Sequence, residues 1–170
     1  MTTLHAEPFN LDAVGFYFDN LDDYNAKAEN LTDRHGCPVE EFEIQFIDGE
    51  RADAELFEAL GINQANLATW FDDIEMLDER EKAALFYLVL DLGHTLDEAM
   101  NKLDDVALHE GELLEAATEL FDELYLHDVP EAVRGYMDYE AFARDCRLGG
   151  DMAEFEFGGT TYTVTNAAGL

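Results

Sequence analysis

The alternation of hydrophobic and polar residues divides the chain into short elements of both kinds. Residues 42–47 alternate apolar and polar side chains, which is typical of a half-buried strand. Residues 14–18 form a short apolar run with strand character ahead of the polar pair Asp19-Asn20. Apolar residues at helical spacing predict helices at residues 21–34, 53–60, 64–77, 79–92, 96–103 and 112–126.

The last third of the chain predicts a second set of strands. Residues 104–109 have strand character. Residues 153–157 and 160–165 flank Gly158-Gly159, which is a strong signal for a two-residue hairpin turn. Strands at both ends of the chain, with helices between them, predict an α+β fold.

A helical hairpin is predicted between these strands, in the segment VPEAVRGYMDYEAFARDCRL at residues 129–148. Asp128 can cap a first turn that begins with Pro130, and Asp138 can start a second helix. Glu140 and Arg144 lie one turn apart and can form an ion pair. The buried stripe of the second helix is expected to consist of Tyr139, Phe142, Ala143 and Cys146.

The order of elements predicts three small domains. They are an α+β domain at residues 1–61, a helical bundle at 62–103 and an α+β domain with a C-terminal β-hairpin at 104–170. No linker rich in proline or serine separates them. We expect an elongated arrangement of domains in a row, because it keeps like charges apart.

Among the properties of the sequence, the net charge restricts the possible functions most strongly. Forty acidic residues against nine basic ones give −31 at pH 7, which excludes direct binding to nucleic acid. Duplex DNA carries one charge per ~1.7 Å of its axis, so this charge matches that of roughly 15 base pairs. The natural partners of such a surface are cations, basic surfaces and DNA-binding clefts.

The acids are grouped along the chain rather than scattered. Glu112, Glu115, Glu119 and Asp122 form one helical stripe, with neighbours roughly 4.5–6 Å apart, close to the spacing of phosphates. A solvated helix face is the simpler explanation, but the chain has only three lysines to mix with its acids. We name the eighteen grouped carboxylates the acidic set: Glu40, Glu41, Glu43, Asp48, Glu50, Asp72, Asp73, Glu75, Asp78, Glu79, Asp97, Glu98, Asp104, Asp105, Glu112, Glu115, Glu119 and Asp122.

No pattern predicts catalysis, a metal site or a cofactor. The five histidines have no ligand spacing, and the glycine pairs are typical of turns rather than of a phosphate-binding loop. Cys37 and Cys146 are expected to be reduced thiols. The N-terminus lacks the features of a signal peptide, and no apolar run is long enough to span a membrane. We therefore expect a cytoplasmic protein that is not an enzyme.

The helical hairpin also carries a family resemblance. The pattern VPE-x-V-x-x-Y-x-D-Y-E-A-x-A-R-D within residues 129–148 is similar to the segment that marks the ArdA-type antirestriction proteins. Proteins of this family mimic DNA and are encoded on mobile genetic elements. The resemblance extends more loosely to residues 40–48 and 61–63 and through the C-terminal hairpin. The residues that carry it most specifically are Pro130, Glu131, Tyr136, Asp138, Tyr139, Glu140, Ala143, Arg144 and Asp145.

The resemblance implies a specific activity. It implies three domains in a row and a homodimer formed through the C-terminal domain. The acidic surface of such a dimer resembles bent B-form DNA and occupies the DNA-binding site of type I restriction–modification enzymes. One region departs from the family pattern: AEPFNLDAVGFYFDN stands where many members have a Tyr-x-x-Asn-Leu-x-x-Tyr-Asn-x-Gly strand and turn. We therefore expect a shortened first domain.

Two other functions fit the same composition. A halophile's protein of unrelated activity would also be rich in acids and poor in lysine, and it would unfold at low salt. An acidic decoy or chaperone for another DNA-binding protein would share the charge but not the target. The role of Arg134, Arg144 and Arg147 is also open: they either pair with Asp138, Glu140 or Asp145 or remain exposed.

Overall fold

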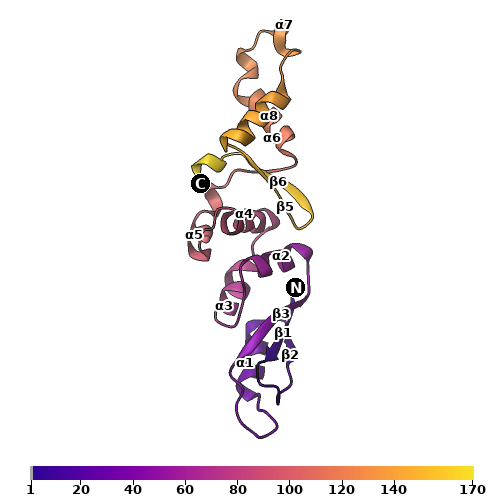
Figure 1. Cartoon of the computed structure of the whole chain (residues 1–170), viewed down its shortest axis with the longest axis vertical. Helices are drawn as coiled ribbons and strands as arrows, with labels where there is room; N and C mark the ends of the chain where they lie inside the picture. The colour runs from indigo at the N-terminus through magenta and orange to yellow at the C-terminus, as the bar shows by residue number, and fades with distance from the viewer. Residues whose placement is uncertain (1) are drawn as a thin grey trace. The chain divides into compact units, whose positions relative to one another are not determined.

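The structure is a computed structural model that describes residues 2–170, which form two compact units, 2–82 and 83–170. Both units combine helices with a small antiparallel sheet (Figure 1), which confirms the predicted α+β class. The expected boundaries after residues 61 and 103 and the arrangement of domains in a row stay predictions.

The first unit is built on a three-stranded sheet. Its strands are β1 (Thr3–Pro8), β2 (Phe16–Phe18) and β3 (Phe42–Asp48), in the order β2-β1-β3 with antiparallel pairing. The predicted strands at 14–18 and 42–47 are β2 and β3. The sequence did not predict the central strand β1, although Leu4 and Ala6 within it are fully buried.

The helices of the first unit cover this sheet. They are α1 (Leu21–Asn30), α2 (Arg51–Ala59), α3 (Leu67–Thr69) and the π-helical turn η1 (Trp70–Ile74). Asn20 caps α1 as predicted, because its side chain accepts a hydrogen bond from Asp23 N over 2.9 Å. Leu4, Phe18, Leu56 and Trp70 are fully buried, and the Phe57 and Trp70 rings meet edge to face at 5.1 Å.

One predicted helix is wrong in its form. The spacing of apolar residues predicts a single helix over residues 64–77, with the preceding Asn63 suited to its cap, but these residues fold as a three-residue helix followed by the π-helical turn. The Asn63 side chain instead accepts a hydrogen bond from Ala65 N over 2.9 Å, while Asn66 occupies the cap position. A local turn made by the Asn63 side chain therefore competes with the helix start.

The second unit starts within helix α4 (Glu79–Leu90), because residues 79–82 of this helix belong to the first unit. Its further elements are α5 (Leu96–Asn101), η2 (Leu103–Asp105), β4 (Leu108–Glu110), α6 (Leu113–Leu124), η3 (Leu126–Asp128), α7 (Glu131–Arg134), α8 (Tyr139–Gly149), β5 (Ala153–Phe157), β6 (Thr160–Val164) and η4 (Ala167–Gly169). The predicted C-terminal hairpin is confirmed: β5 pairs with β6 around Gly158 and Gly159, which both have positive φ. The sheet order is β4-β6-β5.

Two contacts organise the core of the second unit. Helix α4 packs on the hairpin, with the Phe86 and Phe157 rings 4.9 Å apart. Helices α6 and α8 lie side by side (Figure 1) and bury Leu113, Ala117 and Ala143 together with Cys146 and Met152. The burial of Cys146 raises the pKa of its thiol.

Of the two helix caps predicted in the helical hairpin, one is confirmed and one is wrong. Asp138 does cap α8, because its Oδ1 accepts a hydrogen bond from Ala141 N over 2.9 Å. Asp128 does not cap α7: it ends the 3₁₀ turn η3, and Pro130 occupies the cap position without a side-chain hydrogen bond. Of the expected stripe on α8, Ala143 and Cys146 are buried, while Tyr139 and Phe142 are half-buried.

The first unit contains a buried ion pair. Lys82 Nζ lies 2.7 Å from Asp53 Oδ1, and the two residues are only 8% and 4% exposed. The pair ties α2 to the first turn of α4. A buried charge that loses its partner is strongly destabilising, because water cannot replace the contact.

We therefore expect Lys82→Met to lower the free energy of unfolding by about 3–5 kcal/mol, since it leaves the Asp53 carboxylate buried without its cation. Urea denaturation measures this without adding screening ions. Lys27→Met is the matched control, because Lys27 pairs with Asp23 at the surface and its loss is expected to cost about 1 kcal/mol or less. Equal losses in the two variants would contradict the importance assigned to the buried pair.

Candidate functional site

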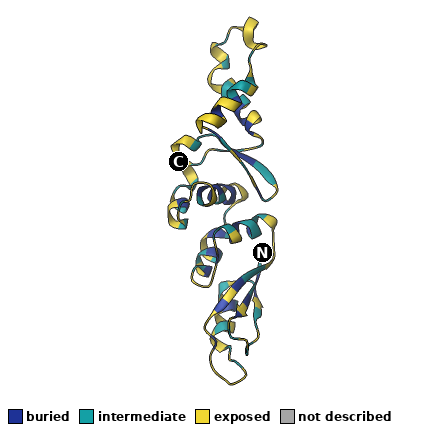
Figure 2. Ribbon diagram, viewed as in Figure 1, coloured by how far each residue is buried: buried dark blue, intermediate teal, exposed yellow. Residues whose placement is uncertain are grey.

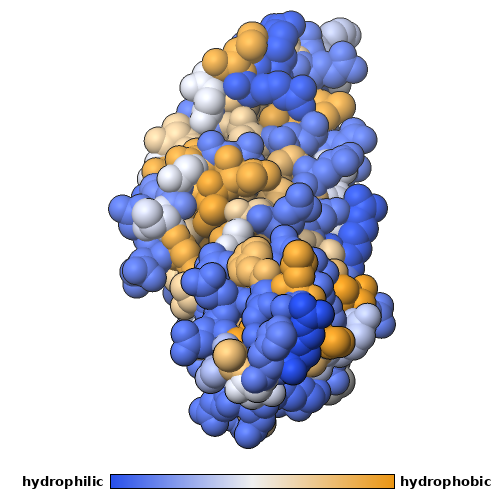
Figure 3. Space-filling view, turned by 60° about the horizontal axis from the view of Figure 1, so that its bottom comes forward, coloured by the Kyte–Doolittle hydropathy of each residue, from blue (hydrophilic) through white to orange (hydrophobic). Residues whose placement is uncertain are grey.

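The acidic set is almost entirely on the surface of the two units. Figure 2 shows the burial of the chain, and every member of the set is exposed except Glu75, which is partly buried. The carboxylates of residues 40–50 and 72–79 belong to the first unit, and those of residues 97–105 and 112–122 belong to the second. On the face drawn in Figure 3, hydrophilic side chains surround smaller apolar patches.

The clearest stripe of the acidic set lies along α6. Glu112 occupies the cap position of this helix, and Glu115, Glu119 and Asp122 follow on its exposed side. The opposite side of α6 buries Leu113, Ala116 and Ala117. The amphipathic pattern of α6 therefore fixes which way the carboxylates point.

Neighbouring elements hold the far end of the α6 stripe. Tyr139 on α8 donates its hydroxyl hydrogen bond to Asp122 Oδ1 over 2.5 Å. This hydrogen bond to the ionised acid raises the pKa of the Tyr139 phenol. His109 on β4 places Nδ1 3.3 Å from Glu119 Oε2.

The absence of a side chain at Gly111 leaves room for the side chains of Glu115 and His109 beside the α6 stripe. A Cβ atom at this position would lie 2.7 Å from Glu115 Oε2 and 2.9 Å from His109 Nε2, and the residue has φ +144°. Any larger residue would displace both side chains, so the turn between β4 and α6 depends on glycine here.

Uncharged donors also hold carboxylates of the set elsewhere. Glu43 accepts a hydrogen bond from Gln45 Nε2 over 3.0 Å, and Glu75 accepts one from Thr2 N over 3.1 Å. Asp78 and Glu98 belong to capping boxes at the starts of α4 and α5. The hydrogen bond from Thr95 N lowers the pKa of Glu98.

Most of the scarce basic side chains contact other acids. Lys27, Lys82, Arg34, Arg51, Arg144 and Arg147 form ion pairs with Asp23, Asp53, Asp12, Glu55, Asp145 and Glu154, in that order. None of these six acids belongs to the acidic set. The negative charge of the set is therefore not cancelled by these cations.

The arginines of the last third of the chain follow the predictions only in part. Arg144 pairs with Asp145 at 3.4 Å, one of the partners expected for it, rather than with Glu140 one turn away. Arg147 pairs with Glu154, which the sequence did not predict, and Arg134 Nε donates a hydrogen bond to Val129 O.

The residues of the family motif form one corner of the second unit. Pro130 and Glu131 start α7, and Tyr136, 87% exposed, lies in the connection to α8. Asp138 caps α8, and Tyr139, Glu140, Ala143, Arg144 and Asp145 lie along it, with Ala143 in the core.

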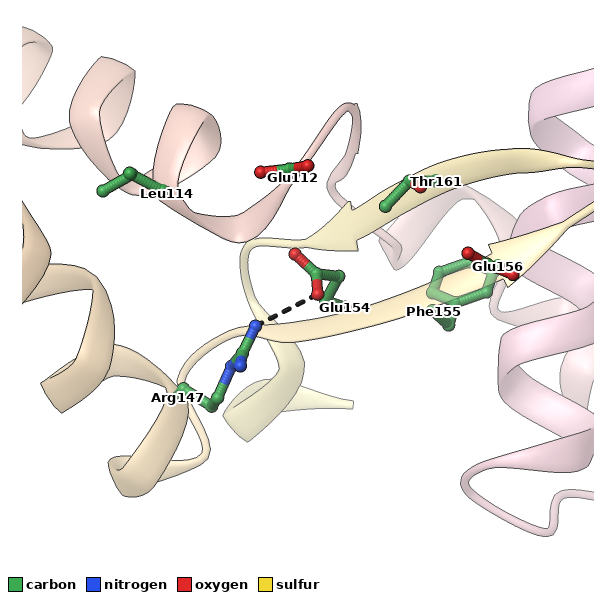
Figure 4. Close-up of a pocket in the computed structure, with 7 residues that line it drawn as sticks. All are labelled: Glu112, Leu114, Arg147, Glu154, Phe155, Glu156 and Thr161. Atoms are coloured by element: carbon green, nitrogen blue, oxygen red, sulfur yellow. Dashed lines mark hydrogen bonds and ion pairs between the residues drawn. The ribbon is translucent and has the colours of Figure 1, made fainter.

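A groove beside the start of α6 has a volume of about 610 Å³. Figure 4 shows Glu112, Arg147 and Glu154 at its wall, with the Arg147–Glu154 ion pair at 3.1 Å. Glu154 also accepts a hydrogen bond from Leu113 N over 2.7 Å, so its carboxylate is used in holding the start of α6. This arrangement is typical of a structural contact rather than of an acid–base pair.

Within residues 2–170, no cluster of three or more His, Cys, Asp or Glu side chains has the geometry to hold a metal ion. In the same part of the chain, no helix is both long enough and apolar enough to cross a membrane.

Comparison with known proteins adds the family. The sequence matches the family model described as antirestriction protein (ArdA) over residues 9–161. The chain belongs to the ArdA family of antirestriction proteins. No curated protein and no solved structure matches it. Membership of this family identifies the chain as an antirestriction protein.

Sequence reasoning located the carboxylates of this ArdA chain but not the groups that hold them. Tyr139 was expected to be a buried stripe residue, and His109 was considered only as a scattered histidine. Their contacts with Asp122 and Glu119 join residues 17 and 10 positions apart through the packing of α8 and β4 on α6. No local pattern could have revealed them.

Repulsion between the exposed acids should make stability depend on salt. We expect the melting temperature to rise by roughly 3–8 °C between 20 mM and 500 mM NaCl at pH 7, because added ions screen like charges. The quadruple variant Glu112→Gln, Glu115→Gln, Glu119→Gln and Asp122→Asn should show a smaller rise. Thermal unfolding followed by circular dichroism measures both, and a melting temperature independent of salt would contradict the expectation.

Proposed function

We propose that this ArdA chain acts as a mimic of B-form DNA that occupies the DNA-binding site of type I restriction–modification enzymes. The supporting observation is the exposure of the acidic set on both units while six of the nine basic side chains pair with other acids. A DNA-binding cleft is lined with basic groups that neutralise phosphates. Exposed carboxylates at regular spacing offer such a cleft the same kind of partner.

The proposed mechanism is occupation of the cleft rather than catalysis. Each carboxylate makes a weak contact that salt screens, and the affinity comes from the number of such contacts. Neutralising one acid should weaken inhibition no more than a few-fold, since the contacts are spread over both units. We place this action in the cytoplasm, where the enzyme meets DNA.

We further propose that the working form is a homodimer that associates through residues 104–170. The apolar side chains of Leu124, Tyr125, Val133 and Tyr136 are about half exposed or more in this region and offer a surface that a second copy can cover. Two copies would double the net charge of −31, in line with a longer stretch of DNA.

The alternatives predict different behaviour in solution. A halophilic protein would unfold in dilute buffer, whereas the two apolar cores described above favour folding without high salt. A decoy for another DNA-binding protein would bind that protein and leave type I enzymes active.

The direct test is a competition titration. Purified protein is added to a type I restriction–modification enzyme bound to its labelled recognition duplex at moderate salt. We expect displacement of the duplex at near-stoichiometric amounts, and a steep loss of displacement as salt increases. Failure of a folded protein to displace the duplex would overturn the proposed target.

A variant pair tests the acidic set within the same assay. Neutralising the four carboxylates of the α6 stripe should raise the concentration needed for displacement by about tenfold, if each contact contributes roughly 0.3–0.4 kcal/mol. The matched control neutralises four exposed acids outside the set: Asp22→Asn, Glu29→Gln, Glu58→Gln and Glu131→Gln. Equal losses would show that only net charge matters, and complete loss from one substitution would contradict the distributed contacts.

A further inference from the structure

Long acidic side chains on a helix surface normally sample several rotamers. A phosphate in duplex DNA is held by the backbone, so a protein that presents carboxylates in its place loses affinity whenever those side chains must be ordered on binding. A lysine or arginine could order them, but it would also cancel the charge. An uncharged donor can order a carboxylate and leave its charge intact.

Tyr139 has the geometry of such a donor. Its hydroxyl lies 2.5 Å from Asp122 Oδ1, and Asp122 is the last carboxylate of the α6 stripe. Asp122 remains exposed despite this contact, and its second oxygen is not used by Tyr139. The carboxylate is therefore fixed in place while it still faces solvent.

The Tyr139 ring itself packs in a partly buried cluster of aromatic side chains from α6 and α8. It meets Phe121 edge to face at 5.5 Å, and Phe121 packs in the same way on Phe142 at 5.2 Å. The hydroxyl thus extends from a packed ring, unlike the long flexible side chain of a lysine. This rigidity lets the phenol restrict the position of Asp122.

His109 makes a comparable contact one turn earlier on the stripe. Its Nδ1 lies 3.3 Å from Glu119 Oε2, and its side chain is mostly buried on β4 while Glu119 is largely exposed. Two neighbouring carboxylates of α6 are therefore held by side chains from two different elements packed against it.

We propose that Tyr139 is a positioning residue of the DNA-mimicking surface, which holds the Asp122 carboxylate at a phosphate-like position without neutralising it, and that the contact with His109 likewise restrains Glu119. This inference rests on the proposed function, because a fixed carboxylate matters only if a basic cleft binds it. Tyr139 belongs to the family motif, so the inference gives one motif residue a role at the acidic surface.

The test compares Tyr139→Phe with the wild-type chain in the competition titration over a range of salt concentrations. Tyr139→Phe removes only the hydroxyl and leaves the net charge at −31. We expect displacement to weaken by up to about twofold at every salt concentration, with an unchanged slope against salt, since one side chain must now be ordered on binding. Asp122→Asn should weaken displacement and also reduce the slope, because it removes a charge.

The double variant and two controls complete the experiment. Once Asp122→Asn is present, adding Tyr139→Phe should have no further effect. Tyr17→Phe is the matched control, because Tyr17 is an exposed tyrosine on β2, outside both the acidic set and the proposed dimer surface, and the variant should displace DNA as the wild type does. His109→Phe should weaken displacement independently of Tyr139→Phe, which provides a second variant should the first not fold.

A spectroscopic measurement separates positioning from general stability. The phenol of Tyr139 should titrate above its ordinary pKa in the ultraviolet absorbance of the wild type, and should return toward it in Asp122→Asn. A folded Tyr139→Phe variant with wild-type displacement would overturn the positioning role while leaving the proposed function intact. Failure of the wild-type chain to displace DNA would overturn both.

Discussion

Repulsion between like charges is the constraint on which this structure depends. A net charge of −31 opposes any compact state, so the chain must gain its stability from apolar packing and from ion pairs made by its nine basic residues. Each unit meets this demand with its own core, one around Trp70 and one around the contact of α6 with α8. Lys82 is used inside the first unit, where its partner Asp53 is out of reach of water and salt.

The same constraint explains how the acidic side chains are held. A carboxylate can be ordered by a cation or by an uncharged donor, and only the second choice preserves the charge. Backbone N–H groups at helix starts, the Gln45 amide and the Tyr139 hydroxyl all serve the acidic set in this way. Six basic side chains meanwhile stabilise turns, helix surfaces and the start of α6 through other acids. These ion pairs thus stabilise the fold without neutralising the acidic set.

These features connect the fold to antirestriction. Membership of the ArdA family identifies the chain as an antirestriction protein, and the exposed acids are the feature on which the proposed DNA mimicry rests. The family motif covers α7 and α8, and α8 packs on α6, so that Ala143 contributes to the core of the second unit and Tyr139 reaches the acidic stripe. One short segment therefore contributes both to the core packing and to the contacts of the acidic stripe.

The sequence by itself determined the charge, the family, the amphipathic helices such as α6, and the hairpin around Gly158-Gly159. These depend on residues close together in the chain, whose spacing or turn chemistry has few solutions. Only the tertiary structure decided that Thr3–Pro8 forms the central strand β1, that Trp70–Ile74 forms a π-helical turn, and that Asp53 meets Lys82. It also decided that Tyr139 and His109 hold Asp122 and Glu119. The strand, the ion pair and the two side-chain contacts depend on partners that are not neighbours in sequence, because burial and tertiary contacts, rather than local propensity, set their free energies.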